Sequence, residues 1–179
     1  MGLLEANNAA WALDRKARAE GWPFRCDATL DFGRRELNAL RDLWRARATG
    51  KAAPSRADFD ARSLKPYLRH IMIIERVYVA PDRWRYRTRL AGTAVTEIIG
   101  DPTGKFLDQQ LPPELLPRWT SVYDAVLDGA EPLRLVADFE LPQLCFLRGE
   151  ILIAPLADRN GRLTLVFGCI YFAPRRGKD

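Results

Sequence analysis

The chain has 179 residues, of which 47% are apolar, and carries a formal net charge of +5. These values are typical of one soluble globular domain with an extension. No apolar run approaches the roughly 18 residues of a membrane-spanning helix, and the N-terminus lacks an apolar segment with a cleavage site, so we expect neither a membrane protein nor a secreted one.

The cysteines and the single histidine limit the chemistry that the chain can perform. Cys26, Cys145 and Cys169 are odd in number and far apart, which favours a reducing compartment, so we expect a cytoplasmic protein. A zinc site or a Ser-His-Asp triad would have to be built around His70 alone. Because the spacing also offers no nucleophile–base pair, we expect no metal site and no enzymatic activity.

The first 33 residues are expected to form a helical extension and a linker. Residues 3–20 have a weak apolar stripe at helical spacing, Gly21-Trp22-Pro23 interrupts it, and residues 22–34 show no clear period. A second helix is predicted over residues 35–48, where apolar side chains recur at three- and four-residue spacing. Its apolar face consists of Leu37, Leu40, Leu43 and Trp44.

Two strands and a short helix are predicted in the middle of the chain. The strands cover residues 71–79 and 83–90, and the second alternates with a two-residue period. Gly92 ends it, a short helix over residues 94–99 follows, and Gly100 ends that helix. On the second strand, Arg83, Arg85, Arg87 and Arg89 fall on one side and Trp84, Tyr86, Thr88 and Leu90 on the other.

The long helix predicted over residues 115–128 has the clearest period. Its apolar face includes Trp119 and Tyr123, and its polar face includes Asp124 and Asp128. Three further strands are predicted over residues 132–141, 144–156 and 162–172.

The last of these strands is apolar on both faces. Phe167 and Cys169 lie on one face, and Val166 and Ile170 on the other. A strand of this kind is covered from both sides, so we expect it at the centre of the sheet.

The segment around the short helix resembles the first half of a PAS domain. The motif Arg-x-x-Gly-Thr, a short helix and Gly-x-x-x-Thr-Gly-Lys/Arg is matched with one loop residue fewer, by Arg89, Gly92, Thr93, Gly100, Thr103, Gly104 and Lys105. A second matching loop contains Pro54, Arg56, Asp58 and Phe59. The similarity extends over roughly residues 34–172 and is close to a PAS-like family of small single-domain bacterial proteins.

This resemblance implies an α+β fold. A five-stranded antiparallel sheet with the spatial order 2-1-5-4-3 would carry helices on one face, with the N-terminal helices added to it. The chain would divide into an extension and linker (1–33), a PAS-like domain (34–173) and a basic tail (174–179).

The resemblance also implies a non-catalytic sensory or signalling module. Such a module binds a small ligand or a signalling protein partner and acts through association. The alternative is a structural protein–protein adaptor without a ligand pocket.

Five residues are candidates for a ligand site inside the domain. Trp84, Tyr86, Trp119 and Tyr123 combine an aromatic body with a polar group, and Arg148 is a charge within an otherwise apolar strand. A pocket with aromatic walls and a few polar groups is the usual form of a ligand site. A filled core, in which the tyrosine hydroxyls bind backbone groups, accounts for these residues equally well.

No cofactor is expected. The haem-binding relatives implied by the resemblance carry their histidine on the long helix, whereas His70 precedes the first strand. Light-sensing flavin-binding relatives carry a reactive cysteine where this chain has Gly104, and only a positioned sulfur can attack the flavin. Haem and photoactive flavin are therefore disfavoured.

The arginine row on the second strand has two interpretations. It resembles a nucleic-acid-binding stripe, but in the PAS order this strand is an edge, and edge strands carry outward charges that prevent aggregation. Nucleic acid is therefore not expected as a partner.

A homodimer is predicted from the burial that the sheet requires. If the helices of the domain cover one sheet face, the other needs cover as well. The apolar face of Leu37, Leu40, Leu43 and Trp44 is the candidate interface, supplied by the same chain or by a second one. The sequence leaves open whether the N-terminal helices pack on their own chain or across a dimer.

Overall fold

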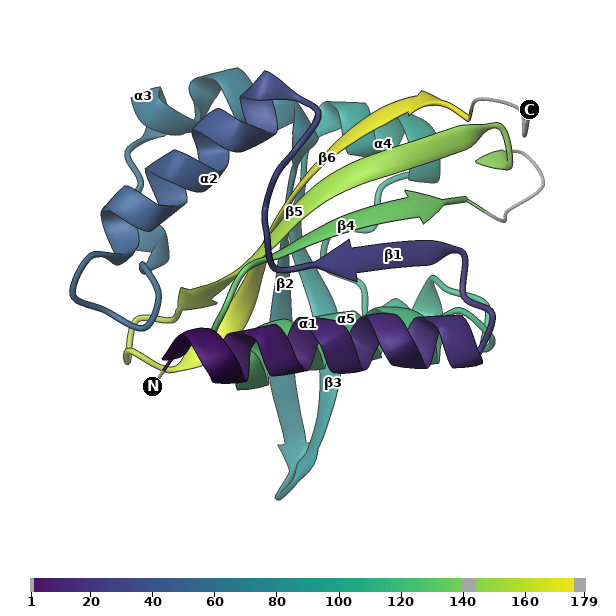
Figure 1. The fold of residues 1–179 in the computed structure, drawn as a ribbon, viewed down its shortest axis with the longest axis horizontal. Coiled ribbons are helices and arrows are strands. Elements are labelled where there is room, and N and C mark those ends of the chain that lie inside the picture. The colour runs from purple at the N-terminus through teal and green to yellow at the C-terminus, as the bar shows by residue number, and fades with distance from the viewer. Residues whose placement is uncertain (1, 140–143, 176–179) are drawn as a thin grey trace.

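The structure is a computed structural model that describes residues 2–139 and 144–175, and the side chains of residues 9–139 and 144–175. Its centre is one six-stranded antiparallel sheet with the order β1-β4-β5-β6-β2-β3 (Figure 1). The strands are β1 (Phe24–Asp27), β2 (Ile71–Ala80), β3 (Arg83–Ala91), β4 (Leu133–Asp138), β5 (Leu147–Ala157) and β6 (Leu163–Pro174).

Five α-helices and three short 3₁₀ helices surround the sheet within the described residues. The α-helices are α1 (Gly2–Ala19), α2 (Arg35–Ala48), α3 (Ala61–Leu64), α4 (Thr93–Ile99) and α5 (Leu116–Gly129). The 3₁₀ helices are η1 (Arg56–Asp58), η2 (Lys65–His70) and η3 (Leu107–Gln109). No helix in the described ranges is long and apolar enough to cross a membrane.

The predicted α+β fold and strand order are confirmed. In chain order the five expected strands are β2, β3, β4, β5 and β6, and β6 lies between β5 and β2. Its pairing with β5 runs from Leu147↔Pro174 to Ala157↔Leu163. The expected tail covers residues 174–179. Pro174 is the last residue of β6, and residues 176–179 lie outside the described residues.

A sixth strand replaces part of the expected linker. β1 pairs with β4 along four residues, from Phe24↔Ala137 to Asp27↔Arg134. Phe24 and Cys26 are buried, and Arg25 between them is exposed. Because four residues are too few for a two-residue period to stand out from its surroundings, the sequence alone did not indicate this strand.

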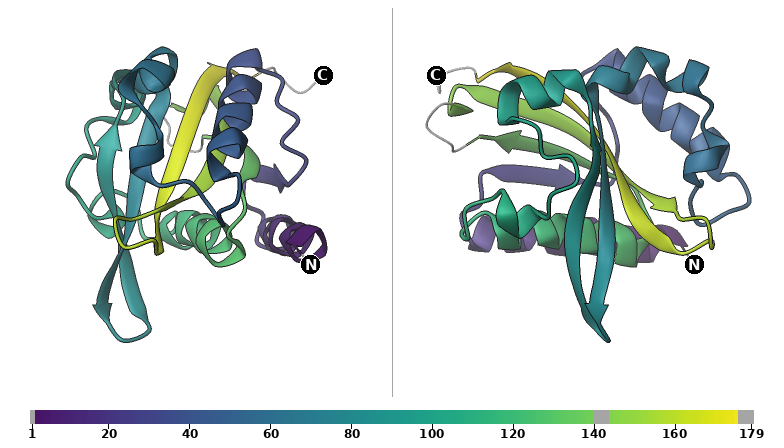
Figure 2. Two further views of the ribbon diagram at one scale, coloured as in Figure 1. Left: turned by 90° about the vertical axis from the view of Figure 1, so that its left-hand side faces the viewer. Right: turned by 180° about the vertical axis from the view of Figure 1, so that it is seen from behind.

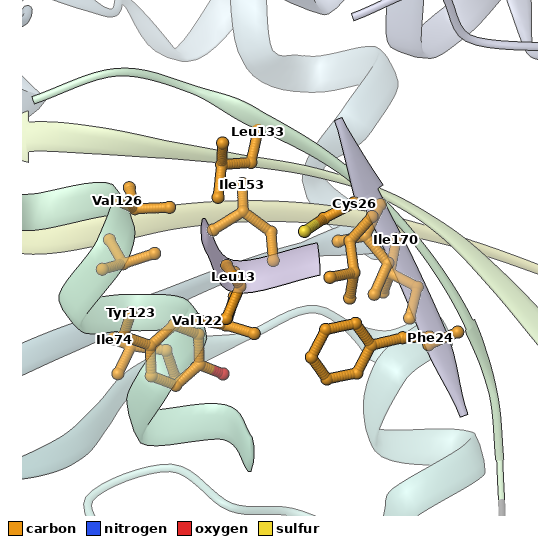
Figure 3. Packing of buried hydrophobic residues seen from close by; sticks show 14 of the residues in the cluster. Leu13, Phe24, Cys26, Ile74, Val122, Tyr123, Val126, Leu133, Ile153 and Ile170 are labelled. Atoms are coloured by element: carbon orange, nitrogen blue, oxygen red, sulfur yellow. The ribbon is translucent and has the colours of Figure 1, made fainter. Parts of the chain in front are cut away.

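The inner face of the sheet carries α1, α4 and α5. α1 and α5 lie side by side (Figures 1 and 2), and α1 buries Ala10, Leu13 and Ala17 against the inner core. Figure 3 shows Leu13 of α1 and Val126 of α5 in the same cluster as Leu133 and Ile153 of the sheet.

α2 covers the outer face from the same chain. Leu37, Leu40 and Trp44 are buried in a second core, and Leu43 is half-buried against it. The Trp44 Nε1 also donates a hydrogen bond of 3.1 Å to the backbone oxygen of Pro155 on β5. The sheet residues of this core include Leu152, Ala154, Leu156, Phe167 and Cys169.

This arrangement corrects the reason given for a homodimer. The candidate interface residues on α2 form the intramolecular outer core, and α1 has its own place beside β1 and α5. A second chain is therefore not needed to cover either sheet face. Leu37, Leu40 and Trp44 are buried within their own chain, and Leu43 is half-buried.

Gly92 sets the corner between β3 and α4. A Cβ atom at this position would lie 2.2 Å from the backbone oxygen of Leu68 and 2.4 Å from that of Arg69. The Gly92 amide donates a 2.8 Å hydrogen bond to the Ile71 oxygen. The absence of a side chain thus lets the chain pass closely over η2 and turn into α4.

We predict that Leu40→Ala lowers the free energy of unfolding by about 2–5 kcal/mol, because the side chain is fully buried and its removal leaves a cavity. Leu43→Ala is the matched control on the same helix and should cost clearly less, since Leu43 is half-buried. Urea denaturation measures both. Equal small losses would contradict the packing of α2 on the outer face.

Candidate ligand-binding cavity

A cavity of about 430 Å³ lies between the inner face of the sheet and the segment from α4 to α5. Its volume falls within the range of small-molecule sites, about 300–1,000 Å³. Its wall is mostly apolar. The apolar lining includes Phe24, Met72, Ile74, Val95, Ile99, Leu107, Leu111, Leu115, Trp119, Phe139, Ile151, Ile153, Val166, Ile170 and Phe172.

The central strand leaves room for this cavity at Gly168. The alternation of β6 places Gly168 on the inner face with Val166 and Ile170, and all three line the cavity. A Cβ atom at Gly168 would meet the Cβ and the backbone oxygen of Met72 at 3.9 Å, which is ordinary van der Waals contact, so a Cβ atom fits there without a clash. The cavity also reaches the surface, because Ile99 lines it and is 42% exposed.

Four polar side chains in the wall have different surroundings. The Asp138 carboxylate is paired with Arg148 at 2.6 Å and with Arg175 at 3.4 Å. The Gln110 Nε2 donates to the Phe106 oxygen at 3.1 Å. Arg118 also has an interaction partner. In contrast, the Thr88 Oγ1 is buried and has no hydrogen-bond partner among the described residues.

Of the five residues expected to bind a ligand, Trp119 and Tyr123 line the cavity. Figure 3 shows Tyr123 of α5 and Phe24 of β1 on the inner side of the sheet. Burial raises the pKa of the Tyr123 hydroxyl, so this group stays protonated at neutral pH. Arg148 is exposed and binds Asp138, and it contributes no lining atoms.

Trp84 and Tyr86 belong instead to a polar cluster on the other side of α5. They lie around the buried guanidinium of Arg76, which is 4.7 Å from the Trp84 ring. The Arg76 Nε donates to the Tyr86 hydroxyl at 3.0 Å. The Asp124 Oδ1 accepts hydrogen bonds from the Tyr86 hydroxyl, from the Trp84 Nε1 at 3.0 Å and from Arg76 at 2.8 Å.

This cluster holds α5 against β2 and β3. Arg76 also donates to Asp128, one turn further along α5, at 2.7 Å. Burial lowers the pKa of Arg76, but its hydrogen bonds to Asp128 and Tyr86 outweigh that effect, so the residue stays charged. The sequence placed Asp124 and Asp128 on the polar face of α5 and did not predict their contact with Arg76. The helical period of α5 shows which face the two residues share, but not which side chain of the sheet lies opposite them.

The Tyr123 ring connects the cavity to this cluster. Its centroid lies 5.2 Å from that of Tyr86, in an edge-to-face arrangement, and 6.2 Å from that of Trp119. Tyr123 therefore contacts both a residue of the cavity wall and a residue that binds Arg76.

The cysteines and His70 lie away from the cavity wall. Cys169 is in the outer core, Cys26 is buried beside α1, Cys145 is exposed, and none lines the cavity in the described part of the chain. The His70 ring stacks on Tyr171 at 4.0 Å, and burial lowers its pKa.

The described residues contain no cluster of three or more histidine, cysteine or acidic side chains that could hold a metal. Gly104 has a backbone φ of +82° and offers no thiol. That the protein carries no cofactor stays a prediction.

The arginine row on β3 is largely paired with nearby carboxylates. Arg85 binds Asp108 at 2.7 Å, and Arg87 and Arg89 bind Glu75 at 2.6 and 3.3 Å. β3 is an edge strand, as expected. These ion pairs reduce the positive charge that the row would present to nucleic acid.

We predict that Asp124→Ala lowers the free energy of unfolding by about 2 kcal/mol or more, because Arg76 then loses a charged partner inside the fold. Asp128→Ala should cost less than about 1 kcal/mol, since the Asp128 side chain is 61% exposed. Chemical denaturation of both variants tests the difference, and an equal effect of the two would contradict it.

The family comparison covers most of the chain. A model described as "PAS domain" matches residues 34–171. No curated protein matches. Among solved structures, 35 chains match.

Three of these structures show the extent of the similarity. An RNA-binding light-oxygen-voltage receptor is 14% identical with a TM-score of 0.41, over 66% of this chain and 35% of its own length. A light-oxygen-voltage domain studied with a flavin analogue is 16% identical with a TM-score of 0.45, over 64% of this chain and 84% of its own length. A sensory box sensor histidine kinase from Vibrio cholerae is 16% identical with a TM-score of 0.42, over 81% of this chain and 98% of its own length. On the family match over residues 34–171, the chain belongs to the PAS domain family.

Proposed function

We propose that this PAS domain protein is a non-catalytic sensory module that binds a small, mostly apolar molecule in the inner cavity. The observation that carries this proposal is the cavity itself, about 430 Å³ with a predominantly apolar wall. An apolar hollow deprives its lining of packing partners, and a ligand that fills it restores those contacts. The ligand is thus expected to stabilise the folded protein.

The route from ligand to output is proposed to pass through α5. Trp119 and Tyr123 line the cavity, and Asp124, the next residue, holds Arg76 on β2. β2 continues into a hairpin with β3 that extends beyond the rest of the sheet (Figures 1 and 2). Near its end, Tyr78 and Val79 are 56% and 42% exposed. This hairpin is suited to contact a signalling partner.

The exposed hairpin also supports a second candidate, a protein–protein adaptor. In that case Tyr78 and Val79 would bind a partner without any ligand in the cavity. The two candidates differ in whether the cavity takes up a small apolar molecule.

Uptake of N-phenyl-1-naphthylamine, an uncharged dye that fluoresces in apolar sites, tests the proposal. We predict saturable binding by the wild type. Gly168→Leu should weaken it at least about fivefold, because Gly168 lines the cavity and the new side chain would take up cavity space and overlap the dye.

Two measurements accompany this test. The thermal midpoint shows whether Gly168→Leu is folded, and Leu43→Ala, on the opposite sheet face, should bind the dye like the wild type. Dye binding that is absent in the wild type, or unchanged in a folded Gly168→Leu protein, would favour the adaptor.

A homodimer and a cytoplasmic location stay proposals. The surface that supports association is now the exposed face of α1, where Trp11 is 59% exposed and stacks under Arg15 at 4.5 Å. We predict a species of twice the 20.4 kDa chain mass in sedimentation at micromolar concentration, and a shift to monomer in Trp11→Ser. A wild-type monomer would refute the dimer.

A further inference from the structure

Thr88 is the residue in the cavity wall whose presence the fold does not explain. Its relative exposure is 0%, it lines the cavity, and its Oγ1 has no hydrogen-bond partner among the described residues. Valine has nearly the same shape and would carry no such hydroxyl. A buried polar group without a partner is unfavourable, so the hydroxyl calls for a partner that the protein does not provide.

The backbone of Thr88 is already fully engaged in the cavity wall. Its amide donates to the Lys105 oxygen at 3.0 Å, and its oxygen accepts from the Gly104 amide at 2.8 Å. These bonds hold β3 to the loop between α4 and η3. They fix the residue in place and leave the side-chain hydroxyl as its remaining polar group.

The charged groups of the wall are occupied. Asp138 is neutralised by Arg148 and Arg175, and Arg118 is not free. A charged ligand would lose its hydration on entering and would have to displace one of these existing interactions. The wall therefore favours an uncharged molecule.

We propose that the ligand is an uncharged, largely apolar molecule with one hydrogen-bonding group, a hydroxyl or a carbonyl, that pairs with the Thr88 Oγ1. This inference rests on the proposed function and specifies its ligand class. The apolar body packs against the aromatic and aliphatic wall, and the polar group satisfies the hydroxyl that the fold leaves unpaired. Thr88 thereby selects among apolar molecules of similar size.

Three probes share the naphthalene ring and differ in one substituent. Naphthalene has no polar group, 2-naphthol has a hydroxyl, and 2-naphthoate has a charged carboxylate. Their affinities are measured by displacement of N-phenyl-1-naphthylamine from the wild type, from Thr88→Val and from Thr88→Ser. Thr88→Val removes the hydroxyl and keeps the shape, and Thr88→Ser keeps the hydroxyl.

In the wild type, 2-naphthol should bind more tightly than 2-naphthoate. Thr88→Val should weaken 2-naphthol about 3- to 10-fold relative to its effect on naphthalene, which is the usual range for one hydrogen bond. Thr88→Ser should retain the preference. Without any probe, Thr88→Val should raise the thermal midpoint, because an unpaired buried hydroxyl is removed.

The outcomes separate the two proposals. If the dye itself does not bind, the proposed function fails and this inference fails with it. If the dye binds but none of the three probes displaces it, the cavity takes up apolar molecules and this inference fails alone. If naphthalene and 2-naphthol respond equally to Thr88→Val, or 2-naphthoate binds most tightly, the cavity binds ligands but the class named here is wrong. A lower thermal midpoint of Thr88→Val would assign the hydroxyl a structural role and overturn the inference.

Discussion

The structure depends on one constraint, the burial of both faces of β6. Phe167 and Cys169 lie in the outer core, and Val166 and Ile170 lie in the inner one. Each face has to be covered, because leaving either in water would expose a large apolar surface. α2 covers the outer face, and α1 and α5 cover the inner face beside the cavity. The N-terminal extension is therefore part of the core of this chain, although the match to the PAS family begins only at residue 34.

The two faces are not filled alike. The outer core is closed over bulky side chains such as Trp44 and Phe167, whereas Gly168 leaves space on the inner face. α5 divides this inner space. Its residues Trp119 and Tyr123 line the cavity, and Asp124 holds Arg76 on the far side. A single helix thus contacts both the cavity and the base of the β2–β3 hairpin.

The sequence by itself determined the elements with a strong period and their order. The two-residue alternation of β3 and β6 and the helical periods of α2 and α5 follow directly from side-chain spacing, and the PAS-like motif supplied the sheet order. These signals are local, since each depends on residues within one element. They also indicated Trp119 and Tyr123 as inward-facing side chains, and they placed Thr88 on the inner side of its strand.

The tertiary structure decided what depends on distant segments meeting. Four residues of the expected linker became β1 because β4 offered a free edge. Arg76 acquired its partners from a helix about 50 residues away in sequence, and Trp84 and Tyr86 joined that cluster instead of the cavity. The cavity and the unpaired Thr88 hydroxyl arise only where several elements close around a space. No local period encodes such features, because periodicity reports which side of an element a residue faces and not which side chain stands opposite.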